Sequence, residues 1–162
     1  MADFSFDIVS EINQMELDNA FNQADREIGT RFDFKNTGTK FEKGDLKITI
    51  ESDTEERAKA ALDVLKDKLV KRQVSLKHLE AKDPELSGKT YRIHCTFKEG
   101  ISTENAKKIA KVIRDEGPKS VKTQIQGESL RASSKSKDDL QATMTLVKNG
   151  EWDFAVQFTN YR

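Results

Sequence analysis

Ile48–Leu65 reads ITIESDTEERAKAALDVL, and Leu130–Val147, which begins 82 positions later, reads LRASSKSKDDLQATMTLV. Both stretches begin with apolar and polar residues in alternation, the pattern of a strand that has one buried face. Each then has a hydroxyl residue, Thr54 or Ser136, followed by apolar residues at helical spacing, which is typical of a capped amphipathic helix. The sequence therefore predicts two copies of one strand–helix unit.

The remaining segments predict the same order of elements in both halves. In the first half we expect strands at 4–9, 32–34, 46–51 and 74–79 and helices at 14–30 and 54–72. After a linker at 83–88, we expect strands at 91–97, 121–125, 130–132 and 154–158 and helices at 102–117 and 136–149. The predicted fold class is α+β, with two tandem ferredoxin-like βαββαβ units. Each unit is an antiparallel four-stranded sheet with two helices on one face, which leaves the other face uncovered.

The composition predicts a soluble, cytoplasmic protein. Of the 162 residues, 35% are apolar and 35% are charged, and the apolar runs are much shorter than a membrane span. The N-terminal residues lack the pattern of a secretory signal peptide. Cys95 is the only cysteine, so an internal disulfide cannot form. We therefore expect no association with a membrane.

Charge is unevenly distributed along the sequence. Residues 1–86 contain 14 Lys+Arg and 19 Asp+Glu, whereas residues 87–162 contain 14 Lys+Arg and 9 Asp+Glu. A basic second half is consistent with a surface that binds an anionic partner. It is equally consistent with charge pairing between an acidic and a basic unit of the same chain.

Residues suited to catalysis or metal binding are scarce. The motifs HExxH, CxxC, GxGxxG and GxxxxGKS/T do not occur. Cys95 alternates with the apolar residues of the predicted strand 91–97 and is interpreted as a core residue. Asp138 and Asp139 fall in the first turn of a predicted helix, where negative charge interacts favourably with the helix dipole. We expect no catalytic residue, no metal site and no cofactor, and an enzyme is the least favoured class of protein.

The candidate binding residues alternate with apolar residues on two neighbouring strands of the second half, or follow them at the next helix start. They are Lys122, Gln124, Gln126, Arg131, Ser133, Lys135 and Lys137. The cations are suited to phosphate, and the amides and hydroxyl to a base or a sugar. Polar residues of these types are also ordinary on a solvated sheet face. The outward positions of these two strands carry no aromatic residue, which argues against base stacking of the kind that RNA-recognition motifs use. Trp152 could serve in packing or in stacking.

Eight short segments occur in a characteristic order. They are Ser5–Glu11, Arg31–Lys35, Leu69–Arg72, Gly100–Ile101, Asn105–Ile109, Val121–Gln126, Lys135–Gln141 and Val156–Arg162. The ordered set resembles the YajQ family of bacterial proteins along nearly the whole chain. Two positions depart from the family pattern. Ser134 stands where glycine is common, and Lys137 replaces an arginine, which keeps the charge but loses the bidentate geometry of a guanidinium.

The resemblance implies that the two ferredoxin-like domains exchange their first strands. The first domain would then comprise residues 10–98, with the strand at 90–98 supplied by exchange. The second would comprise residues 1–9 together with 99–162.

The resemblance also implies a non-enzymatic nucleotide-binding function. Members of the family are described as nucleotide-binding proteins, and some resemble receptors for cyclic di-GMP that act through partners, including transcription regulators. Binding to tRNA has also been attributed to members. We therefore carry three hypotheses: a nucleotide-binding protein, an RNA-binding module that uses the same basic face, and a protein-interaction adaptor that binds no nucleotide.

Overall fold

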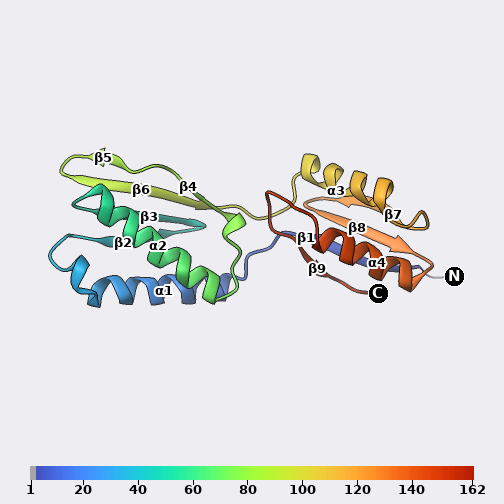
Figure 1. Cartoon of the computed structure of the whole chain (residues 1–162), viewed down its shortest axis with the longest axis horizontal. Coiled ribbons are helices and arrows are strands. Elements are labelled where there is room, and N and C mark those ends of the chain that lie inside the picture. Colours follow the sequence, from blue (N-terminus) through green and yellow to red (C-terminus); the bar gives the residue numbers. More distant parts are fainter. Residues whose placement is uncertain (1–2) are drawn as a thin grey trace. The chain divides into compact units, whose positions relative to one another are not determined.

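The structure, a computed structural model, describes residues 3–162. The described chain has an α+β fold with four α-helices and two antiparallel sheets, one of four strands and one of five (Figure 1). It divides into two compact units. We call Ile12–Lys98 the central unit, and residues 3–11 with Glu99–Arg162 the terminal unit.

The central unit contains the five-stranded sheet. Its elements are α1 (Gln14–Thr30), β2 (Lys40–Gly44), β3 (Lys47–Ser52), α2 (Glu55–Lys71), β4 (Leu79–Ala81), β5 (Glu85–Ser87) and β6 (Thr90–Phe97). The strand order is β2-β3-β6-β4, and β5 also pairs with β6. Helices α1 and α2 lie over one face of the sheet (Figure 1). Apolar side chains from the sheet and both helices form the core, among them Ile48 and Ile93 from the sheet and Leu17 and Leu65 from the helices.

The terminal unit contains the four-stranded sheet. Its elements are β1 (Phe4–Val9), α3 (Thr103–Glu116), β7 (Lys122–Gln126), β8 (Ser129–Ser134), α4 (Lys137–Lys148) and β9 (Gln157–Thr159). The strand order is β7-β8-β1-β9, so the first strand of the chain lies between β8 and β9. Helices α3 and α4 cover one face of this sheet (Figure 1). Phe6, Ile8 and Leu130 of the sheet form a core with Ile109 of α3 and Val147 of α4.

The strand–helix repeat predicted by the sequence is present in both units. Thr54 caps α2 by accepting a hydrogen bond from the backbone N–H of Arg57, and Ser136 caps α4 in the same way from Asp139. The likeness extends to one buried hydroxyl at the end of each strand. Ser52 Oγ, at the end of β3, lies 2.8 Å from Thr39 Oγ1, and Ser134 Oγ, at the end of β8, lies 2.8 Å from Ser120 Oγ. The offset of 82 positions between the two stretches therefore identified equivalent positions correctly.

Four predictions about local elements were wrong in whole or in part. The last predicted strand, 154–158, is strand only from Gln157, since β9 spans Gln157–Thr159. Phe32–Phe34 forms a 3₁₀ turn rather than a strand, because only Phe34 is buried while Phe32 is 88% exposed. The predicted strand at 74–79 consists mostly of a 3₁₀ turn, Leu76–His78, and strand β4 begins at the next residue, Leu79. The predicted linker at 83–88 contains β5, which forms a hairpin with β6 because Gly88 adopts a positive φ of 66° that a tight turn requires.

The uneven charge of the two sequence halves does not appear in the two units. The terminal unit has 11 Lys+Arg and 12 Asp+Glu, and the central unit has 17 and 16. The reason is that the acidic residues of 3–11 belong to the terminal unit, whereas Lys89, Arg92 and Lys98 belong to the central unit. A net attraction between an acidic and a basic unit is therefore not supported, and any anion-binding surface must come from local clustering of cations.

Across residues 3–162, none of the helices has the length and apolar character needed to cross a lipid bilayer. The same residues contain no group of three or more His, Cys, Asp or Glu placed to hold a metal ion.

Candidate functional site

The candidate site lies on the face of the terminal sheet that is turned away from α3 and α4. Gln124 on β7, Arg131 on β8 and Asp7 on β1 are directly opposite one another in the strand register. Side chains at directly opposed positions of antiparallel strands point to the same face. Arg131 therefore stands in a row between an amide and a carboxylate.

A second row runs beside the first. Lys122 lies opposite Ser133, and Ser133 lies opposite Ser5. The row continues past the end of β9, because the backbone of Ser5 exchanges two hydrogen bonds with that of Arg162, of 3.2 and 2.9 Å. Residues that exchange both backbone hydrogen bonds are direct neighbours, so Arg162 joins this row. The row thus has a cation at each end and two hydroxyl groups between them.

Arg131 is paired with Asp7. Its Nε lies 2.8 Å from Oδ1 and its Nη2 3.3 Å from Oδ2 of Asp7, and Asn160 donates a further hydrogen bond of 2.9 Å to Oδ2. The Arg131 hydrogen bond is the main cause that holds the pKa of Asp7 below its usual value, against the opposing effect of burial. The same bond raises the pKa of Arg131. Asp7 takes two of the five guanidinium N–H groups, so three remain for a ligand.

The polar neighbours of Arg131 are accessible to different degrees. Lys122 and Gln124 are exposed, whereas Ser133 and Gln126 are half-buried. Gln126 lies opposite Ser129, whose hydroxyl donates to the Gln126 backbone carbonyl over 2.9 Å. The structure thus brings five of the seven predicted site residues together on one face: Lys122, Gln124, Gln126, Arg131 and Ser133.

Lys135 and Lys137 lie at the corner between β8 and α4 and are exposed. The first turn of α4 already satisfies part of its own backbone. Ser134 Oγ accepts from the N–H of Ser136 over 3.0 Å, and Asp139 Oδ2 accepts from Ser120 over 2.5 Å. This corner therefore offers two exposed cations beside acidic side chains, at a helix N-terminus that is already partly capped.

Sequence reasoning missed Arg162 and Asn160, both from the last three residues. No local pattern points to them, because their positions follow from how the C-terminal segment lies beside β1. It also missed a cleft of about 620 Å³ between α3 and the edge strand β7. That cleft is lined by Ala110, Ile113, Arg114, Pro118, Lys119, Val121, Lys122 and Thr123.

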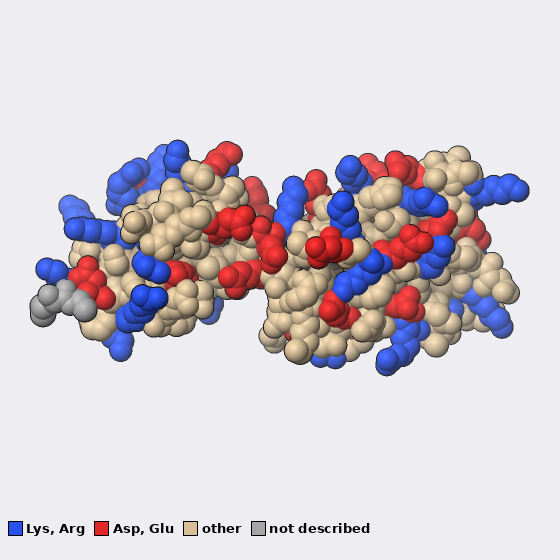
Figure 2. Space-filling view, turned by 180° about the vertical axis from the view of Figure 1, so that it is seen from behind, with Lys and Arg blue, Asp and Glu red and all other residues tan. Residues whose placement is uncertain are grey.

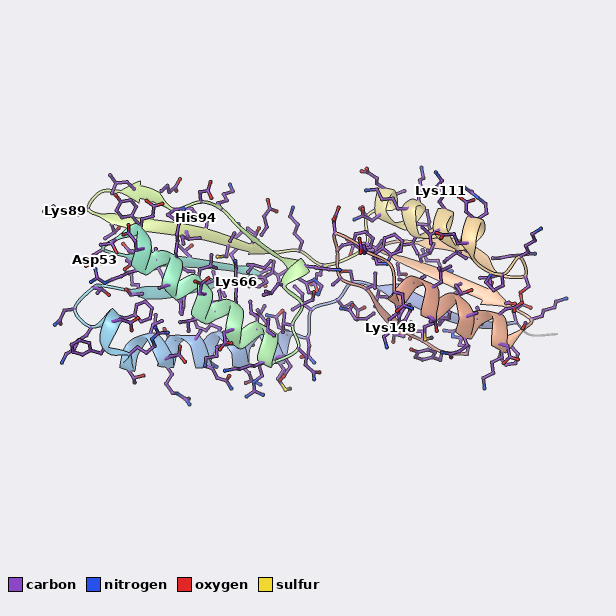
Figure 3. All side chains as sticks on the ribbon, in the orientation of Figure 1. Asp53, Lys66, Lys89, His94, Lys111 and Lys148 are labelled. Atoms are coloured by element: carbon purple, nitrogen blue, oxygen red, sulfur yellow. The ribbon has the colours of Figure 1, made fainter. Side chains whose placement is uncertain are left out.

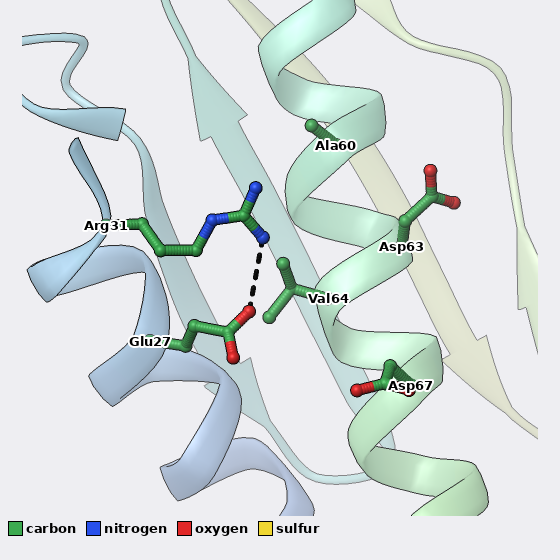
Figure 4. Close-up of a pocket in the computed structure, with 6 residues that line it drawn as sticks. All are labelled: Glu27, Arg31, Ala60, Asp63, Val64 and Asp67. Atoms are coloured by element: carbon green, nitrogen blue, oxygen red, sulfur yellow. Dashed lines mark hydrogen bonds and ion pairs between the residues drawn. The ribbon is translucent and has the colours of Figure 1, made fainter. Parts of the chain in front are cut away.

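Polar groups in the central unit are largely paired with one another. In the cleft of about 270 Å³ between α1 and α2, Arg31 Nη1 lies 3.2 Å from Glu27 Oε2 (Figure 4). Lys68 contacts Glu27 at 2.9 Å, and this hydrogen bond is the first cause that lowers the pKa of Glu27. On the outer face of the five-stranded sheet, Glu51 contacts Lys40 at 3.2 Å and Arg92 at 3.5 Å. These groups are less available to a ligand than Lys122.

Cys95 and Trp152 both serve in packing. The Cys95 side chain is 1% exposed, and burial raises its pKa to about 11, so the thiol stays protonated at neutral pH. Trp152 donates its indole N–H to the carbonyl of Val147 over 2.8 Å and packs against the core of the terminal unit. The core interpretation of Cys95 is therefore confirmed.

The fold is that of an α+β protein whose terminal sheet carries cationic and hydrogen-bonding side chains on its uncovered face. A family model described as "Nucleotide-binding protein YajQ-like" matches residues 4–162. Curated relatives called "Nucleotide-binding protein" occur in Streptomyces griseus (59% identical over 162 residues), Mycobacterium avium (58% over 163) and Mycobacterium tuberculosis (57% over 163). Each comparison covers 100% of both chains. The chain belongs to the YajQ family, which confirms the resemblance seen in the eight segments, and the names of these relatives state binding and no reaction.

Proposed function

We propose that this protein binds a nucleotide on the uncovered face of the terminal sheet and catalyses no reaction. Lys122, Arg131, Lys135 and Lys137 contact phosphate, and Gln124, Gln126 and Ser133 contact the base or the sugar. The observation that carries the proposal is the register of β7 and β8, which places five of these side chains on one face in a family whose relatives are named for nucleotide binding. Cyclic di-GMP is the ligand that we propose first, with signalling through a partner protein such as a transcription regulator.

The ion pair with Asp7 supports a binding role for Arg131. A guanidinium held by a carboxylate keeps one orientation, so less conformational entropy is lost when its remaining N–H groups meet a phosphate. Lys122 is the diagonal neighbour of Arg131 on the next strand, roughly 7–8 Å away between Cα atoms. Within residues 3–162, Lys122 has no ion-pair partner. The two cations together are suited to a ligand with more than one phosphate oxygen to bind.

The proposal includes the architecture that the family resemblance implies. Each unit would be ferredoxin-like, with residues 90–98 completing the first domain (10–98) and residues 1–9 completing the second (with 99–162). The matching strand orders support this. In the terminal sheet β1 lies between β8 and β9, and in the central sheet β6 lies between β3 and β4 at the equivalent place.

Calorimetric titration with cyclic di-GMP, GTP and ATP tests the function. Binding of one of these ligands should weaken by about 1–3 kcal/mol in Arg131→Ala, the usual loss for a hydrogen bond to a charged group. Because Arg131→Ala also leaves Asp7 without its partner, Lys135→Ala provides a change that does not disturb packing. Lys89→Ala removes an exposed lysine of the central unit and is the matched control. Unchanged affinity in both site variants would reject the site.

RNA binding is the second candidate function. It is favoured by three further exposed lysines on α3, Lys107, Lys108 and Lys111, which lie on the helix side of the sheet and could contact a polymer that extends beyond the uncovered face. A protein that binds the phosphate backbone loses affinity steeply as salt increases, because several counterions are released. Titrations of a tRNA and of cyclic di-GMP at several salt concentrations separate the two functions, since a ligand with two phosphates has fewer counterions to release.

A further inference from the structure

The strand β7 is an unpaired edge of the terminal sheet. It pairs with β8 on one side, and in the described chain no strand lies on its other side. An edge strand presents backbone N–H and C=O groups that another extended chain can pair with. Ile125 lies opposite the buried Leu130 and so belongs to the helix side of the sheet, but it is 38% exposed because this edge is open. The edge therefore offers both backbone groups and an apolar contact.

The cleft beside this edge has an apolar floor and a basic rim. Ala110 and Ile113 from α3, with Pro118 and Val121 from the connection to β7, supply apolar surface within the volume of about 620 Å³. Arg114, Lys119 and Lys122 line the same cleft. A cleft of this kind accommodates an apolar side chain whose neighbours carry negative charge.

The rim cations are largely free of competing partners. In the described part of the chain, Lys119 and Lys122 form no ion pair. Arg114 Nε lies 3.6 Å from Asp115, but both side chains are more than half exposed, so this pair contributes little. Lys111, one helical turn before Asp115, extends the basic surface along α3 (Figure 3). Figure 2 shows lysines and arginines gathered toward the edge where α3 and β7 lie.

We propose that this surface binds an acidic, extended segment of a partner protein. The segment adds to the sheet as a strand next to β7, inserts an apolar side chain into the cleft, and places its Asp and Glu side chains against Arg114, Lys119 and Lys122. A peptide accounts for three features at once: the unpaired backbone, the apolar floor and the charge of the rim. A nucleic acid accounts only for the charge. The proposal is independent of the nucleotide site except that Lys122 belongs to both.

Selection from a phage-displayed library of random peptides of about nine residues, long enough to lie along β7, tests the proposal. The full chain is the target. We expect the selected peptides to share an apolar residue flanked by Asp or Glu. Their affinity should fall roughly tenfold or more in Arg114→Gln/Lys119→Glu, since two rim charges are lost or reversed. A library without enrichment, or peptides without an acidic excess, would overturn the proposal.

The control variant is Lys148→Gln/Lys89→Glu. Lys148 stands in the last turn of α4 as Arg114 stands in the last turn of α3, and Lys89 is an exposed lysine of the central unit (Figure 3). This variant should bind the selected peptides with unchanged affinity. Trp152 fluorescence during urea unfolding verifies that the terminal unit of each variant is folded. A polyuridine oligonucleotide is the alternative probe, and if only its affinity falls in Arg114→Gln/Lys119→Glu, the surface binds nucleic acid and the proposal is wrong.

Hydrogen exchange provides a second measurement, which distinguishes strand addition from binding through charge alone. A bound strand protects backbone amides of β7, whereas β9, the opposite edge strand, serves as an internal control. Peptide binding that leaves the exchange of β7 unchanged excludes strand addition. The affinity for cyclic di-GMP should be the same in Arg114→Gln/Lys119→Glu as in the unmodified chain, because neither residue lies on the uncovered face. The two proposals can therefore fail separately.

Discussion

Arg131 and Asp7 form a two-point ion pair on the uncovered face of the terminal sheet, with Nε–Oδ1 at 2.8 Å and Nη2–Oδ2 at 3.3 Å. Asp7 is 5% exposed, and its carboxylate also accepts a hydrogen bond from Asn160. The pair links the first strand of the chain to β8 and fixes the orientation of the central cation of the candidate site. It therefore connects the stability of the terminal unit with its proposed ligand binding.

Replacing Asp7 with Asn should destabilise the terminal unit by about 1–3 kcal/mol at pH 7, because a charged hydrogen bond is lost at a buried position. The folded pKa of Asp7 is lowered, so its contribution to stability is fully present above the pKa of the unfolded carboxyl, about 4. That contribution is lost as the pH falls through the folded pKa. Urea unfolding followed by Trp152 fluorescence should therefore show a difference between the two proteins that shrinks below about pH 4.

The control for Asp7 is Glu151→Gln, which changes an exposed acid of the same unit. It should alter stability by less than about 0.5 kcal/mol at either pH. A difference between Asp7→Asn and the unmodified chain that stays constant down to pH 2 would show that the ion pair is not its cause.

Lys122→Ala should weaken nucleotide binding roughly tenfold without changing the stability of the terminal unit. Lys122 is exposed and has no ion-pair partner among residues 3–162, so its removal breaks no ion pair within this part of the chain. Calorimetric titration measures the affinity, and Lys148→Ala, at the exposed end of α4, is the control. Equal affinities in the two variants would place the ligand elsewhere.

Ser134→Ala should destabilise the terminal unit by about 1–2 kcal/mol. The Ser134 side chain is buried, and its hydroxyl bonds to Ser120 Oγ and accepts from the N–H of Ser136. Ser134→Gly, which introduces the residue that the family resemblance implies at this position, should cost at least as much. If Ser134→Gly instead stabilises the protein in urea unfolding, a backbone requirement for glycine outweighs the hydroxyl at this corner.

Cys95 should be unreactive in the folded protein. With a pKa raised to about 11 and 1% exposure, the thiol is almost wholly protonated at pH 8 and out of reach of reagents. Iodoacetamide at pH 8 should modify it only after denaturation, and mass spectrometry of the product measures this. Rapid modification of the native chain would mean that β6 opens locally.

Much of the fold could be predicted from the sequence because the determining signals are local. A period of two identifies the strands at Phe4–Val9 and Thr90–Phe97, and a hydroxyl before an apolar stripe identifies the starts of α2 and α4. The short turn at Phe32–Phe34 escaped this reasoning, because two aromatic residues in alternation are typical of a strand whether or not both are buried.

The sequence by itself determined the strand–helix repeat, the caps, the core stripes and the family, since each depends on neighbouring residues or on an ordered set of short segments. Only the tertiary structure decided that Asp7 meets Arg131, that Arg162 joins the row of Ser5, and that the two units carry nearly balanced charge. Strands that are equally amphipathic can pair in either sheet, and which pairing forms depends on how all strands and helices pack together. The composition of the candidate site therefore follows from strand register, which brings residues from opposite ends of the chain onto one face.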